Sequence, residues 1–120
     1  MKICIVDDDP NIVELYGAKL KSEGFEVISA SDGEEGLELI KKEMPDLVLL
    51  DIMMPKKDGL SVLKDSRNSE EISRIPVIVL SNVSDDETAT KIGEFSTSFF
   101  VVKSLTTPQK IVGLIKEALI

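Results

Sequence analysis

Five short apolar runs, separated by segments with helical spacing, constrain the fold of this chain more than any other feature of its sequence. Each run has about the length of a β-strand and is rich in Val and Ile. Each is also continuous where a half-exposed strand would alternate with polar residues, which is typical of strands buried on both faces of a parallel sheet. The runs are KICIV from Lys2, EVISA from Glu26, DLVLL from Asp46, PVIVL from Pro76 and FFVV from Phe99.

The segments between these runs carry signals for the starts and ends of helices. Asp9 and Pro10 supply a capping residue and a first-turn proline, and the helix that they begin is expected to end at Gly24. The next helix begins at Ser31 or Asp32, because either residue could make a capping box with a glutamate three positions later. Further helices are expected after Asp58, from Ser84, and from Thr107 to Ile120.

Strand and helix therefore alternate five times along the chain. This order predicts a doubly wound α/β domain, with one five-stranded parallel sheet and helices on both of its faces. A chain of 120 residues suits a single domain, which we expect to cover residues 1–120. We consider the flavodoxin-like strand order 2-1-3-4-5, in which ligands bind beyond the carboxyl ends of the strands.

Composition narrows the class of function. The chain has no histidine, which excludes imidazole triads, His-ligated zinc and a phosphohistidine carrier. A net charge of -8 opposes binding to nucleic acid or to an anionic membrane, and no apolar stretch is long enough to span a bilayer. The single cysteine, Cys4, cannot form an internal disulfide and fits a reducing compartment. We therefore expect a cytoplasmic protein whose chemistry depends on carboxylates, hydroxyls and lysines.

Polar residues suited to one site follow four of the five expected strands. In the expected strand order the acids after the first strand lie about 5 Å from the central third strand, and a lysine after the fifth lies roughly 10 Å from it. Crowded carboxylates repel one another unless a cation offsets their charge, and an all-oxygen site suits Mg²⁺ or Mn²⁺. The residues are Asp7, Asp8, Asp9, Asp51, Ser81 and Lys103.

The three consecutive aspartates divide into two roles. Asp9 is most simply the N-cap of the first helix, which leaves Asp7 and Asp8 to face the expected metal site. Taken alone, the stretch DDDP fits equally well an interpretation in which all three residues only cap a helix and solvate a loop. The matching residues Asp51, Ser81 and Lys103 at the other strand ends favour the metal site.

The stretches IVDDDP, LVLLDIMMPKKDG, PVIVLSN and FFVVKS resemble the receiver domain of two-component response regulators, and the resemblance covers essentially the whole chain. It is most specific in LDIMMPKKDG, where Asp51, Pro55, Asp58 and Gly59 have the family's spacing. The resemblance implies phosphorelay signal transduction, in which a histidine kinase or a phosphotransfer protein donates a phosphoryl group. The chain is similar to stand-alone receivers, so we expect a downstream protein target and a monomer or weak dimer.

The resemblance also implies a role for each matching residue in the phosphoryl site. Asp51 is the nucleophile that becomes an aspartyl phosphate, and this self-catalysed chemistry does not make the domain an enzyme. Mg²⁺ is held by Asp8, Asp51 and the backbone carbonyl of Met53, with Asp7 acting largely through water. Lys103 pairs with one phosphoryl oxygen.

A conformational switch is implied as well. Ser81 donates a hydrogen bond to another phosphoryl oxygen, and its movement leaves space into which the ring of Phe100 turns. The face formed by the fourth helix, the fifth strand and the fifth helix then changes shape. In the stretch SFFVV alone, Phe100 equally fits a plain core aromatic.

Two departures from the family pattern leave a second interpretation open. Ser104 follows Lys103 where the family normally has a proline with a cis peptide bond, and a cis bond before serine costs about 2.5–4 kcal/mol. Asn82 stands where the family commonly has a small residue. Both changes are compatible with a pseudo-receiver, an interaction module that has the fold without phosphorylation.

A third interpretation is a small phosphatase with an aspartate nucleophile. Asp7 and Asp9 form the paired motif found at a strand end in haloacid-dehalogenase-like phosphatases. Asn11 stands where that family expects Thr or Val, and the chain is short for the family's additional elements.

Overall fold

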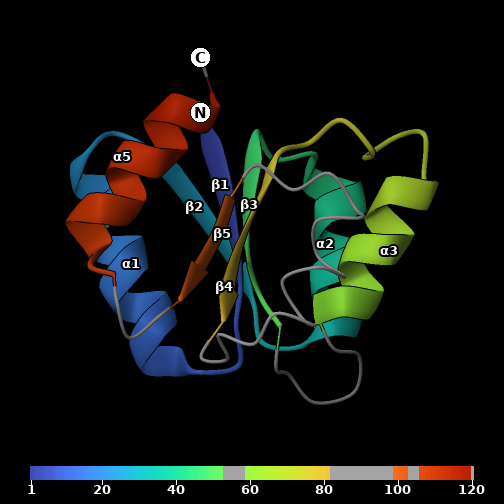
Figure 1. Ribbon diagram of the computed structural model, residues 1–120, viewed down its shortest axis with the longest axis horizontal. Coiled ribbons are helices and arrows are strands. Elements are labelled where there is room, and N and C mark those ends of the chain that lie inside the picture. The colour runs from blue at the N-terminus through green and yellow to red at the C-terminus, as the bar shows by residue number, and fades with distance from the viewer. Residues whose placement is uncertain (53–58, 82–98, 103–105, 120) are drawn as a thin grey trace.

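The computed structural model describes residues 1–52, 59–81, 99–102 and 106–119. In these residues strands and helices alternate along the first part of the chain (Figure 1). The helix expected from Ser84 lies outside the described residues. The elements are β1 (Lys2–Val6), α1 (Pro10–Ser22), β2 (Glu26–Ala30), α2 (Gly33–Glu43), β3 (Leu47–Asp51), α3 (Gly59–Asn68), β4 (Val77–Ser81), β5 (Phe99–Val102) and α5 (Pro108–Ala118).

The strands form one parallel sheet in the order β2-β1-β3-β4, with β5 beside β4. This is the flavodoxin-like order that the sequence predicts. Because β3 lies between β1 and β4, the order along the sheet reverses direction next to β1. Ligands of doubly wound sheets bind at such a reversal, beyond the carboxyl ends of the strands.

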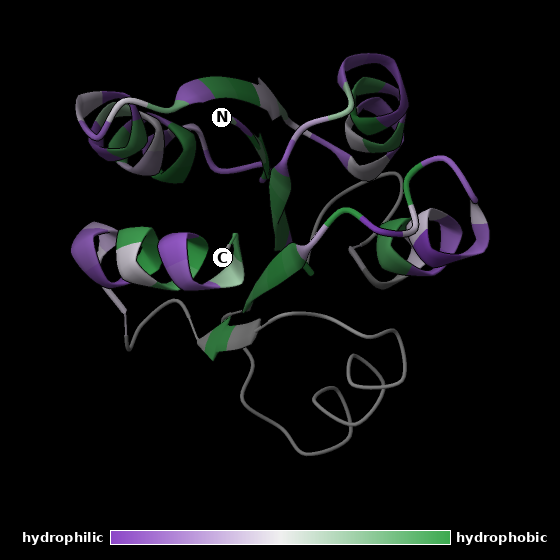
Figure 2. Ribbon diagram, turned by 90° about the horizontal axis from the view of Figure 1, so that it is seen from above, coloured by the Kyte–Doolittle hydropathy of each residue, from purple (hydrophilic) through white to green (hydrophobic). Residues whose placement is uncertain are grey.

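Helices cover both faces of the sheet, α1 and α5 on one side and α2 and α3 on the other (Figure 1). Seen from above, the strands form an apolar layer between helices whose outer faces are hydrophilic (Figure 2). In β1 and β3, successive residues alternate between the two cores, so both faces of these strands are buried. The burial on both faces expected from the sequence is wrong for β2, an edge strand in which Glu26 and Ser29 are exposed. Burial of each Leu, Ile or Val side chain contributes roughly 1.5–3 kcal/mol. The core against α1 and α5 includes Ile3, Ile5, Leu47 and Leu49, and the core against α2 and α3 includes Cys4, Val6, Val48 and Leu50.

Helix ends agree with the local signals in the sequence. Asp9 caps α1 and Thr107 caps α5, each accepting a hydrogen bond from a backbone N–H of the first turn. Gly24 follows the end of α1 with a φ of 92°, a left-handed conformation that glycine adopts without strain. Of the two capping residues that the sequence left open for α2, Asp32 is the one whose side chain accepts this bond, and Ser31 is not.

Cys4 is a buried core residue, as its apolar run suggests. Its side chain is fully buried in β1, and burial raises the pKa of the thiol to about 12. A thiol that stays protonated is a poor nucleophile, so Cys4 contributes packing to the core and no reactive group. In the described part of the chain, no helix combines the length and the apolar character that crossing a membrane requires.

Candidate functional site

The parallel register brings acidic residues from two strands to the same edge of the sheet. Val6 of β1 lies opposite Leu50 of β3, so the next residues, Asp7 and Asp51, reach the same level at the carboxyl ends of adjacent strands. The last residues of β4 and β5, Ser81 and Val102, are also paired with each other. The edge predicted from the sequence is therefore the edge at which the described strands end together.

Each of the three consecutive aspartates has its own environment. Asp9 is exposed, and its Oδ1 accepts a hydrogen bond of 2.9 Å from the N–H of Asn11 at the start of α1. Asp7 is only 1% exposed, and its Oδ1 accepts a bond of 2.9 Å from the N–H of Asp9. Asp8 is exposed, between the other two in sequence. The predicted division is confirmed for Asp9, which serves the helix and leaves the other two acids at the strand end.

Asp7, Asp8 and Asp51 lie close enough together for one cation. Each offers a carboxylate oxygen, and these oxygens all lie within 4.8 Å of one another. Asp51 is 4% exposed, so two of the three acids are buried while Asp8 faces solvent. Three negative charges at this spacing repel one another strongly when little water screens them. The arrangement therefore suits a small divalent cation, with Asp8 as the one of the three acids that is exposed to solvent.

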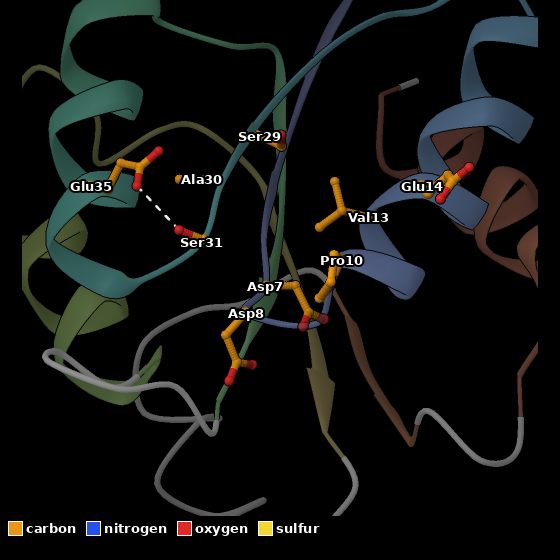
Figure 3. Close-up of a pocket in the computed structure, with 9 residues that line it drawn as sticks. All are labelled: Asp7, Asp8, Pro10, Val13, Glu14, Ser29, Ala30, Ser31 and Glu35. Carbon is orange, nitrogen blue, oxygen red and sulfur yellow. Dashed lines mark hydrogen bonds between the residues drawn. The ribbon is translucent and has the colours of Figure 1, made fainter.

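A cleft of about 320 Å³ opens beside the acids, between the start of α1 and the loop that leads from β2 to α2. Figure 3 shows Asp7 and Asp8 at one end of the cleft, with Val13 of α1 and Ser31 on its sides. Ser31 Oγ donates a hydrogen bond of 3.3 Å to a carboxylate oxygen of Glu35. Sequence reasoning missed this cleft, because its walls come from segments about twenty residues apart that no local pattern links.

Several predicted positions lie outside the residues or side chains that the structure describes. Met53 and Lys103 lie outside the described residues, and so do Asn82 and Ser104. Ser81 and Phe100 belong to β4 and β5, for which the structure describes the backbone at these two positions and not the side chains. The roles expected for these residues stay predictions.

Comparison with known families and curated proteins gives consistent matches. Residues 3–116 match the family model described as the response regulator receiver domain. Probable transcriptional regulators named ycf27 from Guillardia theta and Porphyridium aerugineum are 38% and 37% identical over 118 residues, which is 98% of this chain. The matches cover 45% and 48% of those proteins, so the chain spans about half the length of these curated relatives.

Solved structures with the same fold cover nearly the whole chain. The BeF3-activated N-terminal receiver domain of RstA from Klebsiella pneumoniae has a TM-score of 0.90 at 32% identity, covering 99% of this chain and 98% of that one. A CheY-like response regulator receiver domain protein from Methanospirillum hungatei has a TM-score of 0.91 at 28% identity, covering 98% and 92%.

Proposed function

The chain belongs to the response regulator receiver domain family, and from this premise we propose that it acts in phosphorelay signalling by accepting a phosphoryl group on Asp51. The observation that carries the proposal is the distance of at most 4.8 Å among the carboxylate oxygens of Asp51, Asp7 and Asp8. Asp51 ends β3, which has a strand on each side, so groups from several strand ends can surround a phosphoryl group placed on it.

The donor set fits Mg²⁺. Receiver domains generally bind Mg²⁺ through acidic residues, and this chain presents three carboxylates. In an octahedron with bonds of about 2.1 Å, neighbouring oxygens lie about 3 Å apart and opposite ones about 4.2 Å apart, so oxygens within 4.8 Å need only a small adjustment. We propose that Asp8 and Asp51 hold the ion directly, with the carbonyl of Met53, and that Asp7 acts largely through water. Mn²⁺ suits the same oxygen donors.

The bound ion supplies charge neutralisation, which lets an anionic carboxylate approach an anionic phosphoryl group. An oxygen of Asp51 forms the new bond to phosphorus while the bond from phosphorus to the donor's imidazole nitrogen breaks, and that nitrogen keeps the electron pair. The donor is a histidine kinase or a phosphotransfer protein. Because residues 1–120 contain no histidine, the phosphohistidine that donates the group lies outside them.

The remaining residues complete the proposed site. Lys103 pairs with one phosphoryl oxygen, and Ser81 donates a hydrogen bond to another. Together with Phe100, Ser81 then shifts the face that includes β5 and α5, through which the domain controls a downstream partner protein. In this proposal residues 1–120 form one receiver domain, which acts in the cytoplasm as a signalling phosphoacceptor rather than an enzyme.

Incubation with acetyl phosphate and Mg²⁺, followed by intact-mass measurement, tests the proposal. The wild type should gain the mass of one phosphoryl group, and the Asp51→Asn variant should gain none. The Asp9→Asn variant is a matched control, because it makes the same chemical change at an acid that only caps α1. It should be phosphorylated like the wild type.

Other outcomes would favour the alternatives. Beryllofluoride, the activator named for the RstA receiver domain, should bind this chain with Mg²⁺. A chain that binds neither the phosphoryl group nor beryllofluoride would be a pseudo-receiver. Turnover of a small phosphate ester without any kinase would instead indicate a phosphatase.

A further inference from the structure

The first residue of α3, Gly59, lies against the backbone that carries Asp51. Its N–H donates a hydrogen bond of 2.8 Å to the carbonyl oxygen of Ile52. A β-carbon at position 59 would lie 2.6 Å from the Cα of Ile52 and 2.9 Å from the carbonyl carbon of Asp51, and it would overlap the carbonyl oxygen of Asp51. All of these are backbone atoms, so no side chain can rotate to make room. Only glycine, which has no β-carbon, allows the start of α3 to lie this close to the end of β3.

Ile52, the residue after Asp51, is held by the sheet at its N–H and by Gly59 at its carbonyl oxygen. The N–H of Ile52 donates to the carbonyl oxygen of Leu80 in β4 at 3.3 Å, and its carbonyl oxygen accepts from Gly59. With both ends of this residue bound, the backbone at Asp51 has little freedom to rotate. Its carboxylate is thereby kept within reach of Asp7 and Asp8.

A side chain at position 59 would force the start of α3 and the end of β3 apart by more than the tolerance of a functional site. The separation between the new β-carbon and the Cα of Ile52 would have to open from 2.6 Å to an ordinary contact of at least 3.4 Å, an increase of about 0.8 Å. Functional constellations must be held within about 0.5 Å of their productive geometry. Even if part of the movement is taken up by α3, the remainder falls on the residue that carries the phosphoacceptor.

We propose that Gly59 is a positioning residue for Asp51. Its missing side chain and its N–H set where the Asp51 carboxylate stands relative to Asp7 and Asp8, and thereby how tightly the site holds Mg²⁺. This inference rests on the proposed function, because it assigns a role toward the same site. It concerns the geometry of that site and requires no contact between Gly59 and the ion.

Two other helical glycines provide matched controls for a Gly→Ala change. A β-carbon at Gly113 in α5 would meet nothing within 4 Å, and one at the buried Gly17 in α1 would make an ordinary contact of 3.7 Å with Val27. Both lie on the face of the sheet opposite α3. Neither Gly113→Ala nor Gly17→Ala should move the acids.

The experiment measures Mg²⁺ affinity by calorimetry for the wild type, Gly59→Ala, Gly17→Ala and Gly113→Ala, at a temperature where urea unfolding curves show each protein folded. Gly59→Ala should bind Mg²⁺ about tenfold or more weakly, as is usual when a group that orients a ligand is changed. The two controls should stay within about twofold of the wild type. A folded Gly59→Ala protein with wild-type affinity would overturn the proposal. If the wild type itself binds no Mg²⁺, the proposed function fails instead.

A measurement on the wild type covers the case in which Gly59→Ala does not fold. If metal binding stabilises the hydrogen bond from Gly59 to Ile52, Mg²⁺ should slow the hydrogen exchange of the Gly59 amide. The exchange rate should fall by the factor by which Mg²⁺ binding stabilises the folded site. The amide of Leu119, at the end of α5 far along the chain from the acids, should not respond. A Gly59 amide whose exchange is unchanged by saturating Mg²⁺ would refute the positioning role.

Discussion

Replacing Asp8 by asparagine should make the protein more stable without Mg²⁺ and less stable with it. The variant keeps the shape of the side chain and removes the negative charge of one of the three carboxylates. The oxygens of these carboxylates lie within 4.8 Å of one another. At that distance a pair of charges repels by roughly 1–3 kcal/mol for effective dielectric constants between about 80 and 20. Because Asp8 is exposed, screening keeps the repulsion at the low end of this range. We therefore expect Asp8→Asn to raise the free energy of unfolding by about 1 kcal/mol at low ionic strength.

Saturating Mg²⁺ should reverse this order. A ligand that binds only the folded state stabilises it by about 2.7 kcal/mol at a concentration a hundred times its Kd. If Asp8→Asn weakens Mg²⁺ binding by about tenfold, Mg²⁺ stabilises the variant by about 1.4 kcal/mol less than the wild type. A larger loss of affinity makes this difference larger. The difference between the two proteins should shrink as Mg²⁺ is added and then change sign. Urea unfolding followed by circular dichroism, with and without Mg²⁺, measures both quantities.

The control for this experiment is Asp9→Asn. Both substitutions change the net charge of -8 by one unit, and the two residues are neighbours in the chain. Asp9 caps α1 through the N–H of Asn11, and asparagine caps helices about as well as aspartate. Asp9→Asn should therefore gain the wild-type stabilisation from Mg²⁺. If the two variants respond alike, the effect comes from overall charge, and the reasoning from a three-carboxylate site is refuted.

Two further predictions concern the core of the sheet and the segment before β4. Burial raises the pKa of Cys4 from 9.0 to about 12, so as pH rises the unfolded chain loses the thiol proton before the folded protein does. The free energy of unfolding should therefore fall as pH rises above about 9, by up to about 1.4 kcal/mol per pH unit. Cys4→Ala should flatten this slope in urea unfolding curves, and an equal slope in both proteins would contradict the assignment. The half-buried Arg67 donates from Nη1 to the carbonyl oxygens of Ser73 and Ile75 at 2.8 and 3.0 Å, so Arg67→Met should lower the unfolding free energy by about 1–3 kcal/mol. Arg74→Met, at an exposed arginine, should change it by less than about 0.5 kcal/mol, and a similar loss in both variants would point to charge alone.

Local structure could be predicted from the sequence where it depends on neighbouring residues. The caps at Asp9 and Thr107 were predicted because a capping side chain bonds a backbone N–H two or three positions away. At the start of α2 this reasoning stopped at two equivalent candidates, Ser31 and Asp32, since both have a glutamate at the right spacing. The structure chooses Asp32, whose oxygen accepts from the N–H of Glu35.

The site could be predicted in part, because parallel strands of a known order must end at one edge. That argument predicted that Asp7, Asp8 and Asp51 lie close together. In the structure their carboxylate oxygens lie within 4.8 Å of one another. It could not say that Asp7 accepts the N–H of Asp9 while Asp8 stays exposed. Those details depend on how the chain turns from β1 into α1.

The sequence by itself determines the continuous apolar runs, the helix caps and the acids that follow the strands, because each of these features depends on a few neighbouring residues. The close approach of Gly59 to the backbone of Asp51 and Ile52, and the cleft beside Asp7 and Ser31, are decided only by tertiary structure. The physical reason is that packing sets the distance between a helix and a strand through the combined shapes of both cores. The sequence marks Gly59 by its spacing from Asp51, but only the structure shows that it contacts the backbone at the end of β3.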